Sequence, residues 1–114
     1  MCTQNQAVSI MREVYQACLP IFSGNLMEGY LYGSFARGEQ HPESDIDILL
    51  TVDLSPEAIG QFRRRVASVT SDLSLKHDIT ISVSVKSHRQ FEKYAAVLPY
   101  YQNVIKEGIR YGAS

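Results

Sequence analysis

The chain has 114 residues and a formal net charge of −1, and charged residues make up 20% of it. This length suits a single core, so we predict one domain over residues 1–114 with no separate acceptor-binding domain. The composition excludes a disordered chain, a membrane protein and a general nucleic-acid binder with a dominant basic surface.

A helix is predicted over residues 3–22. Apolar side chains recur at steps of three and four from Val8 to Leu19, which is the spacing of one helix face. Pro20 and the turn-forming residues 23–25 are expected to end it. We assign this helix to the scaffold, because none of its residues suggests catalysis.

The next segment suggests a phosphate-binding turn. Residues 26–32 are predicted to form a strand that leads into Gly33 and Ser34. Glycine lets the backbone approach a ligand or adopt a positive φ. Ser34 is predicted to cap a short helical turn whose free N–H groups favour a polyphosphate. Arg37 adds guanidinium donors within reach of the same anion.

Ten residues after Ser34, a second strand is predicted from Asp45 to Val52. Side chains alternate faces along a strand, so Asp45 and Asp47 point the same way. Two such carboxylates are stabilised by a shared hard cation, typically Mg²⁺ bound together with substrate phosphates. A pair of ions would hold both the attacking and the leaving oxygen of a displacement at phosphorus. The other face of this strand is apolar and is predicted to face the core.

Each of these features also has a simpler interpretation. Gly-Ser pairs are common in turns, and an Asp-x-Asp at the start of a strand is often a solvated edge or a turn cap. Their combination is more informative, because Asp47 lies within an otherwise apolar run, where an unpaired carboxylate is costly to bury. Such a local conflict indicates a functional site.

A second long helix is predicted to begin after Ser55, with Pro56 at its first position. Apolar residues from Ile59 to Leu73 recur at steps of three and four, so one side packs inward. Three consecutive arginines, at positions 63–65, cross this helix. We interpret them as a solvated face, with an anion-binding or partner surface as the alternative.

A third strand is predicted from Asp78 to Val85, where apolar and polar residues alternate. This alternation places Asp78 on the polar face. If the strand is a neighbour of the second one, Asp78 joins Asp45 and Asp47 as a third metal ligand. The remote alternatives for that ligand are Asp53 and Asp72.

Two further helices are predicted, one from Ser87 to Val97 and one from Pro99 to Arg110. Tyrosines gather here, and a tyrosine buries a large ring while keeping a polar tip. We interpret most of them as the edge of the core, with a partner surface or an acceptor for self-modification as alternatives. They are Tyr94, Tyr100, Tyr101 and Tyr111.

The order helix, strand, strand, helix, strand, helix, helix predicts an α+β or α/β fold. We expect a sheet of three or four strands with helices packed on one face and the metal site on the other. Cys2 and Cys18 show neither CxxC spacing nor nearby histidines, so we interpret them as reduced thiols. With no signal-peptide pattern, the expected location is the cytoplasm.

The stretch from Gly33 to Asp47 resembles a known signature. Gly-Ser, ten residues and Asp-x-Asp, written here as GSFARGE followed by SDIDILL, is similar to the motif of the nucleotidyltransferase superfamily that includes DNA polymerase β. The short chain with Ala-Arg-Gly after the Gly-Ser is most similar to the minimal MntA-type antitoxins that are paired with HEPN toxins. The order of the elements extends the resemblance over most of the chain and implies the small mixed sheet of this superfamily.

This resemblance implies Mg²⁺-dependent transfer of a nucleoside monophosphate, with two ions at the site. In the antitoxin subgroup ATP is the donor and a tyrosine of the partner toxin is the acceptor, so a cognate HEPN-type toxin is the implied partner. The implied catalytic residues and metal ligands are Asp45, Asp47 and Asp78, with Asp78 also helping to deprotonate the acceptor. The implied nucleotide-binding residues are Gly33, Ser34 and Arg37.

Two other functions stay open. The chain could nucleotidylate a small molecule, as aminoglycoside-modifying relatives do, but those relatives as a rule carry an additional helical domain for the drug. It could also be a non-catalytic antitoxin that covers its partner and keeps a vestigial nucleotide site. The intact Gly-Ser and Asp-x-Asp motifs argue against such decay.

Overall fold

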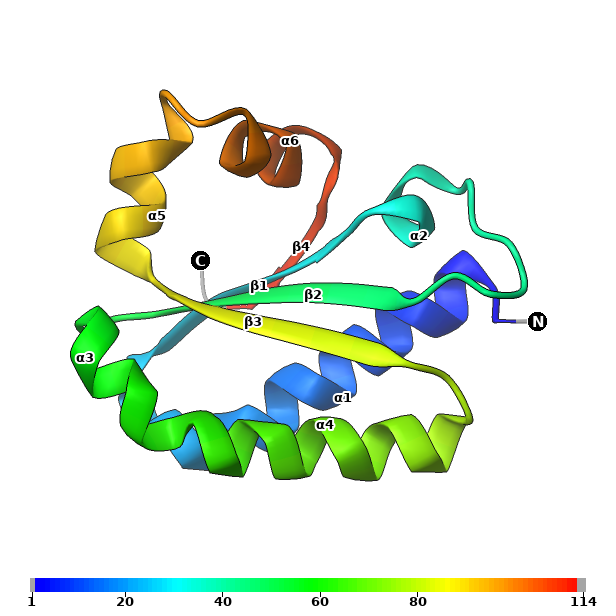
Figure 1. Cartoon of the computed structure of the whole chain (residues 1–114), viewed down its shortest axis with the longest axis horizontal. Helices are drawn as coiled ribbons and strands as arrows, with labels where there is room; N and C mark the ends of the chain where they lie inside the picture. The colour runs from blue at the N-terminus through cyan, green and yellow to red at the C-terminus, as the bar shows by residue number, and fades with distance from the viewer. Residues whose placement is uncertain (1, 113–114) are drawn as a thin grey trace.

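The computed structural model describes residues 2–112, which form a four-stranded sheet with helices on both faces (Figure 1). The strands are β1 (Leu26–Tyr32), β2 (Ile46–Val52), β3 (Ile81–Ser87) and β4 (Ile109–Gly112), in the spatial order β3-β2-β1-β4. β1 pairs antiparallel with β2 and β4, whereas β2 and β3 are parallel. The mixed sheet confirms the predicted fold class.

Helix α1 (Gln4–Phe22) begins with a capping box. The Thr3 hydroxyl accepts from the backbone N–H of Gln6, and the Gln6 side chain accepts from the N–H of Thr3. The predicted C-terminal bound at residue 22 is confirmed, but Pro20 lies inside the helix and does not break it. The helix ends at Phe22, where a 3-10 turn over Ser23–Asn25 leads into β1.

The predicted second helix is broken into two. A short α3 (Pro56–Ile59) is followed by a 3-10 turn at Gly60–Phe62 and then by α4 (Arg63–His77). Ser55 caps α3 as predicted, with its Oγ accepting from the N–H of Ala58 at 3.2 Å. The break falls at a glycine, which has a low helix propensity.

The main core lies between the sheet and the pair α1 and α4 (Figure 1). The face of β2 that was predicted to be apolar is fully buried here, because its four side chains are 0% exposed: Ile46, Ile48, Leu50 and Val52. These contacts fix β2 in position, and β2 carries the start of the candidate site.

The other face of the sheet carries a smaller core under α5 (His88–Ala95) and α6 (Pro99–Glu107). Phe91 of α5 and Val104 of α6 pack with Tyr30 of β1 and Leu49 of β2. We predicted helices on one face of the sheet and the metal site on the other. The second face is also partly covered by helices, namely α5 and α6.

Residues 109–112 form β4, which corrects the prediction of a helix through Arg110. The N–H of Gly108 donates to the carbonyl of Val104 at 2.9 Å, and α6 ends there. Ile109 then lies opposite Leu31 at the other edge of β1. The pairing satisfies backbone groups of β1 that would otherwise face solvent. None of the helices within residues 2–112 has the length and apolarity needed to cross a membrane.

Candidate active site

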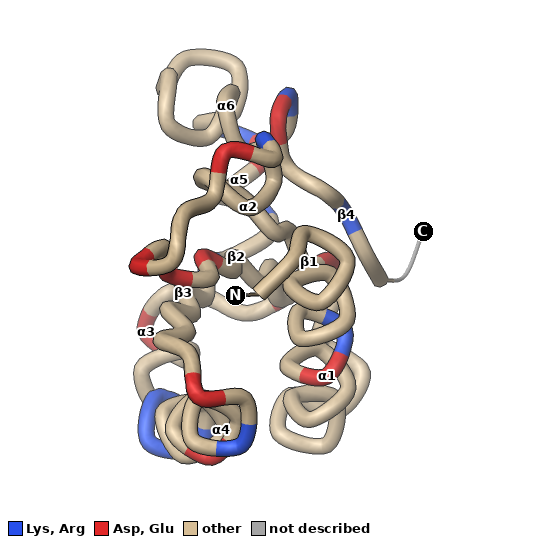
Figure 2. Tube along the Cα trace, turned by 90° about the vertical axis from the view of Figure 1, so that its right-hand side faces the viewer, with Lys and Arg blue, Asp and Glu red and all other residues tan. Residues whose placement is uncertain are grey.

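Asp45 and Asp47 lie at the start of β2. Asp45 is the last loop residue and is exposed, while Asp47 is half-buried in the strand, opposite Tyr32 of β1. Figure 2 shows acidic positions along the loop that leads from α2 into β2. Burial raises the pKa of the Asp47 carboxyl, and the charge of Asp45 raises this pKa further. The two carboxylates therefore repel each other, as expected of a site that binds a cation.

Gly33 lies against Asp47 at the exit of β1. Its φ of +78° is unfavourable for any residue with a side chain, and a Cβ atom here would lie 2.7 Å from Oδ2 of Asp47. Only glycine therefore fits between the strand exit and the carboxylate. A ligand bound beside Asp47 can approach the backbone at this point.

Helix α2 (Ser34–Arg37) is a single turn that begins immediately after this glycine. Gly33 is its N-cap and Ser34 is its first residue, which corrects the prediction that Ser34 is the cap. Within residues 2–112 the Ser34 hydroxyl has no hydrogen-bond partner, so it is available to a ligand. Gly38 ends the turn in the left-handed conformation.

Arg37 is exposed on α2 and contacts two carboxylates. Its Nε lies 3.3 Å from Glu39, and one terminal nitrogen lies 3.5 Å from Glu107 of α6. Exposed ion pairs of this kind contribute little to stability. A triphosphate carries more charge than either carboxylate, so it can compete for the guanidinium.

Asp78 does not join the pair. It is the C-cap of α4, exposed and in the left-handed conformation with a φ of 51°, and β3 starts only at Ile81. The prediction that Asp78 lies on the polar face of a strand is wrong, because the helix cap continues to this residue. Within residues 2–112 no group of three or more His, Cys, Asp or Glu side chains is placed to hold a metal, which also leaves out Asp53 and Asp72.

β3 is nevertheless the neighbour of β2, as the prediction required. The residue that pairs with Asp47 in the parallel register is Ser82. A hydroxyl therefore occupies the strand position where a third acid was expected. The described part of the site has two carboxylates.

A cleft of about 180 Å³ adjoins the pair. Tyr100 of α6 donates to the hydroxyl of Tyr32 at 3.0 Å, and the two rings meet edge to face. Burial raises the pKa of Tyr100, and the hydrogen bond to Tyr32 and the charges of Tyr32 and Asp47 raise it further. The cleft is lined by Tyr32, Gly33, Arg37, Tyr100, Asn103, Val104 and Glu107.

Sequence reasoning did not assign five of these lining residues to the site: Tyr32, Tyr100, Asn103, Val104 and Glu107. The clustering of tyrosines towards the C-terminal end was the one available signal, and it was interpreted mainly as core edge. Nothing in the spacing of α6 indicates that it folds back onto the end of β1. The contact between α6 and β1 is a tertiary contact and could be identified only from the structure.

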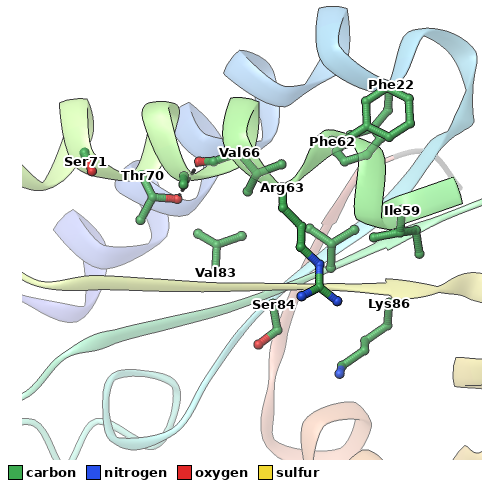
Figure 3. A pocket seen from close by; sticks show the side chains of 12 residues that line it. Phe22, Ile59, Phe62, Arg63, Val66, Thr70, Ser71, Val83, Ser84 and Lys86 are labelled. Carbon is green, nitrogen blue, oxygen red and sulfur yellow. Dashed lines mark hydrogen bonds between the residues drawn. The ribbon is translucent and has the colours of Figure 1, made fainter. Parts of the chain in front are cut away.

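A larger cavity of about 490 Å³ lies on the opposite face, between α4 and β3 (Figure 3). Apolar side chains such as Val66 and Val83 line it, together with Arg63 and Lys86. No carboxylate lines this cavity, whereas the smaller cleft is lined by Gly33, which lies against Asp47. We therefore place phosphate chemistry in the smaller cleft. The arginines at positions 63–65 are all exposed, as predicted for a solvated face.

Comparison with known proteins identifies the family of the chain. The nucleotidyltransferase domain family matches residues 18–111. A relative from Methanocaldococcus jannaschii, named "Putative protein adenylyltransferase MJ0604", is 31% identical over 98 residues, which is 86% of this chain and 90% of the relative. A second from the same organism, "Putative protein adenylyltransferase MJ0141", is 32% identical over 77 residues, 68% of this chain and 76% of the relative.

Solved structures of toxin–antitoxin complexes share the fold. A mutant of the complex of MntA with HpeT has a TM-score of 0.52 and 18% identity, covering 98% of this chain and 74% of that one. A toxin–antitoxin structure with AMP-PNP has a TM-score of 0.52 and 20% identity, with 97% and 73% coverage. At these identities the likeness concerns the fold.

Proposed function

The chain belongs to the nucleotidyltransferase domain family, and on this premise we propose that it transfers AMP from ATP to a tyrosine of a cognate HEPN-type toxin. The observation that carries the proposal is the pair Asp45 and Asp47 beside Gly33. The relatives named protein adenylyltransferases support a protein acceptor. The fold shared with toxin–antitoxin structures supports a toxin as that acceptor.

The residues present fit Mg²⁺ bound together with the nucleotide. Mg²⁺ in nucleotide sites usually takes one or two carboxylates and completes its shell with phosphate oxygens and water. Asp45 and Asp47 supply two such ligands, and their mutual repulsion is relieved by a cation. When bound, Mg²⁺ neutralises charge on the phosphates and positions them for displacement. With two carboxylates, we expect Mg²⁺ affinity to depend on ATP.

Gly33, Ser34 and Arg37 would hold the triphosphate. Gly33 has no side chain and lies directly against the Asp47 carboxylate, so phosphates held by its backbone would lie beside Asp47. The Ser34 hydroxyl and the free N–H groups at the start of α2 would donate to the phosphate oxygens. Arg37 would exchange its exposed carboxylate contacts for the more highly charged phosphates.

The reaction is a displacement at the α-phosphorus of ATP. The acceptor oxygen forms a bond to this phosphorus, the bond between the α-phosphorus and its bridging oxygen breaks, and pyrophosphate leaves. The acceptor proton passes to solvent, since Asp78 is not grouped with the pair within residues 2–112. ATP and Mg²⁺ are available in the cytoplasm, where we place the reaction.

Intact mass spectrometry tests the proposal. The protein encoded beside this chain's gene is incubated with the chain, Mg²⁺ and ATP, and total protein of the source cell is tested in parallel with ATP labelled at the α-phosphate. We expect a gain of one or more AMP units on a protein, lost with Asp47→Asn. Retained transfer by this variant would refute the role of Asp47.

Two other results would lead to a different functional assignment. Label on a small molecule such as an aminoglycoside, with none on protein, would indicate a small-molecule nucleotidyltransferase. A stable complex with the neighbouring protein and no label anywhere would indicate a binding antitoxin with a vestigial site.

A further inference from the structure

The α5–α6 hairpin carries an exposed apolar surface. Within residues 2–112 six large hydrophobic side chains are exposed, and five of them fall between positions 94 and 105. The sixth, Leu75, lies on α4 at the opposite face of the sheet. We call the five the hairpin surface: Tyr94, Val97, Leu98, Tyr100 and Ile105.

The hairpin surface is not the side by which these helices pack on the sheet. That side is formed by Phe91 and Val104, each 2% exposed, against Tyr30 and Leu49. Val97, in contrast, is 67% exposed at the turn between the helices. Soluble proteins rarely leave a large apolar patch without a partner. The concentration of five such residues in one hairpin therefore indicates a docking surface.

This surface is continuous with the candidate active site. Tyr100 belongs to both, because its hydroxyl donates to Tyr32 at 3.0 Å and Tyr32 pairs with Asp47 across β1 and β2. Figure 1 shows the hairpin and α2 on the same side of the sheet. The cleft beside the carboxylates measures only about 180 Å³, too little to hold a protein segment by itself. A protein acceptor needs a larger surface nearby to orient it.

The charges around the hairpin surface define the chemistry of its partner. Both acidic residues of the two helices are engaged, since Glu92 lies 2.7 Å from His88 and Glu107 contacts Arg37. The basic residues of these helices make no ion pair within residues 2–112: Arg89, Lys93 and Lys106. A partner with an apolar patch and an acidic rim is complementary to this arrangement. A second copy of the chain is disfavoured, because the two basic rims would repel each other.

We propose that the hairpin surface docks the protein acceptor of the transfer reaction through an apolar patch with an acidic rim. The inference rests on the proposed function. It also explains how a domain with such a small cleft selects a protein acceptor, because recognition is separated from the chemistry and assigned to an adjacent surface.

The test compares matched exposed substitutions. Val97→Ser with Ile105→Ser removes apolar contact from the hairpin, and Leu75→Ser removes an even more exposed apolar side chain from α4. Each protein is incubated with Mg²⁺, α-labelled ATP and total protein of the source cell, and label on protein is quantified. Binding of Mg²⁺ and ATP is measured separately by calorimetry.

The hairpin variant should transfer label about tenfold more slowly, the effect of losing contacts at the centre of an interface. Its affinity for Mg²⁺ and ATP should match the wild type, and Leu75→Ser should behave like the wild type in both assays. Lys93→Glu with Lys106→Glu should also slow transfer and weaken its dependence on salt.

Three results would overturn the inference. Wild-type transfer by both hairpin variants would refute the docking surface and leave the proposed function standing. An equal loss with Leu75→Ser would show that the effect is not local to the hairpin. Absence of protein labelling by the wild type, despite normal binding of ATP, would refute the proposed function and the inference together.

Discussion

The two faces of β2 differ in what they contribute to the protein. On one face Ile46, Ile48, Leu50 and Val52 are completely buried under α1 and α4. On the other face Asp47 stands beside Gly33 and next to a smaller core. Because side chains alternate faces along the strand, residues that stabilise the fold and the residue assigned to the site are direct neighbours in the sequence. Substitutions at neighbouring positions should therefore have opposite consequences.

The largest stability loss is expected on the packed face. Ile48→Ala should lower the free energy of unfolding by about 2–5 kcal/mol, because it leaves a cavity in the main core. Urea unfolding followed by circular dichroism measures this change. A loss below about 1 kcal/mol would contradict the contrast between the faces.

Gly33→Ala should cost roughly 1–3 kcal/mol and also weaken binding of ATP. The alanine would combine a positive φ with a Cβ atom 2.7 Å from the Asp47 carboxylate. Gly38→Ala is the matched control, since Gly38 has a φ of +70° and no atom near its virtual Cβ. The control should lose stability and still bind ATP in calorimetry. Equal loss of ATP binding in both variants would refute the specific role of Gly33.

Asp47→Asn should stabilise the protein without ligands by roughly 1 kcal/mol at pH 7, the usual scale for relieving a conflict at a functional site. The fold raises the pKa of this carboxyl, so the folded state disfavours its charged form. The penalty is fully present above the folded-state pKa and disappears as the pH falls below the ordinary aspartate pKa. The gain should therefore shrink in acid.

Thermal unfolding at pH 7 and in acid, with and without Mg²⁺ and ATP, measures this effect. The wild type should gain stability from Mg²⁺ and ATP together, and the variant should gain much less. A variant that is less stable than the wild type at pH 7 would contradict the prediction.

The smallest effect is expected at Glu13, which joins α1 to α4. It lies 2.8 Å from Lys76 and also contacts His77, and its pKa is lowered by the hydrogen bond to Lys76 and then by that to His77. A lowered carboxyl pKa stabilises the fold above the ordinary glutamate pKa, and this contribution is lost as the pH falls. Glu13→Gln should cost less than about 1 kcal/mol at pH 7, because the pair is partly exposed. Urea unfolding at pH 7 and pH 4 measures the loss of unfolding free energy caused by Glu13→Gln. We expect a smaller loss at pH 4, and a larger loss there would contradict the prediction.

Much of the fold could be predicted from the sequence because local signals agree with tertiary structure there. β1 has the bounds that were predicted, and the apolar face of β2 is buried as its alternation requires. The pair Asp45 and Asp47 could be predicted because a carboxylate inside an apolar run is costly to bury unless it binds a ligand or a cation. Its relation to Gly33 follows from the antiparallel pairing of β1 with β2.

The errors occurred where a local pattern continued past a structural boundary. The alternation of β3 extends back to Asp78 in the sequence, but aspartate tolerates the left-handed conformation that ends α4. The apolar stripe of α6 extends to Ile109, but the chain leaves the helix at Gly108 and pairs with β1. Sequence spacing does not reveal where the helix or strand ends, because the contacts that determine the boundary are made with residues far away in the sequence.

The place of β4 in the sheet has a consequence for the nascent protein. β4 is the last of the four strands to be synthesised, yet it covers one side of β1, which was among the first. Until residues 109–112 leave the ribosome, the backbone of Leu31 and its neighbours has no partner at that edge. An uncovered strand edge can pair with other chains. Molecules that stop short of β4 are therefore expected to need chaperones or to be degraded, although their catalytic motif is complete.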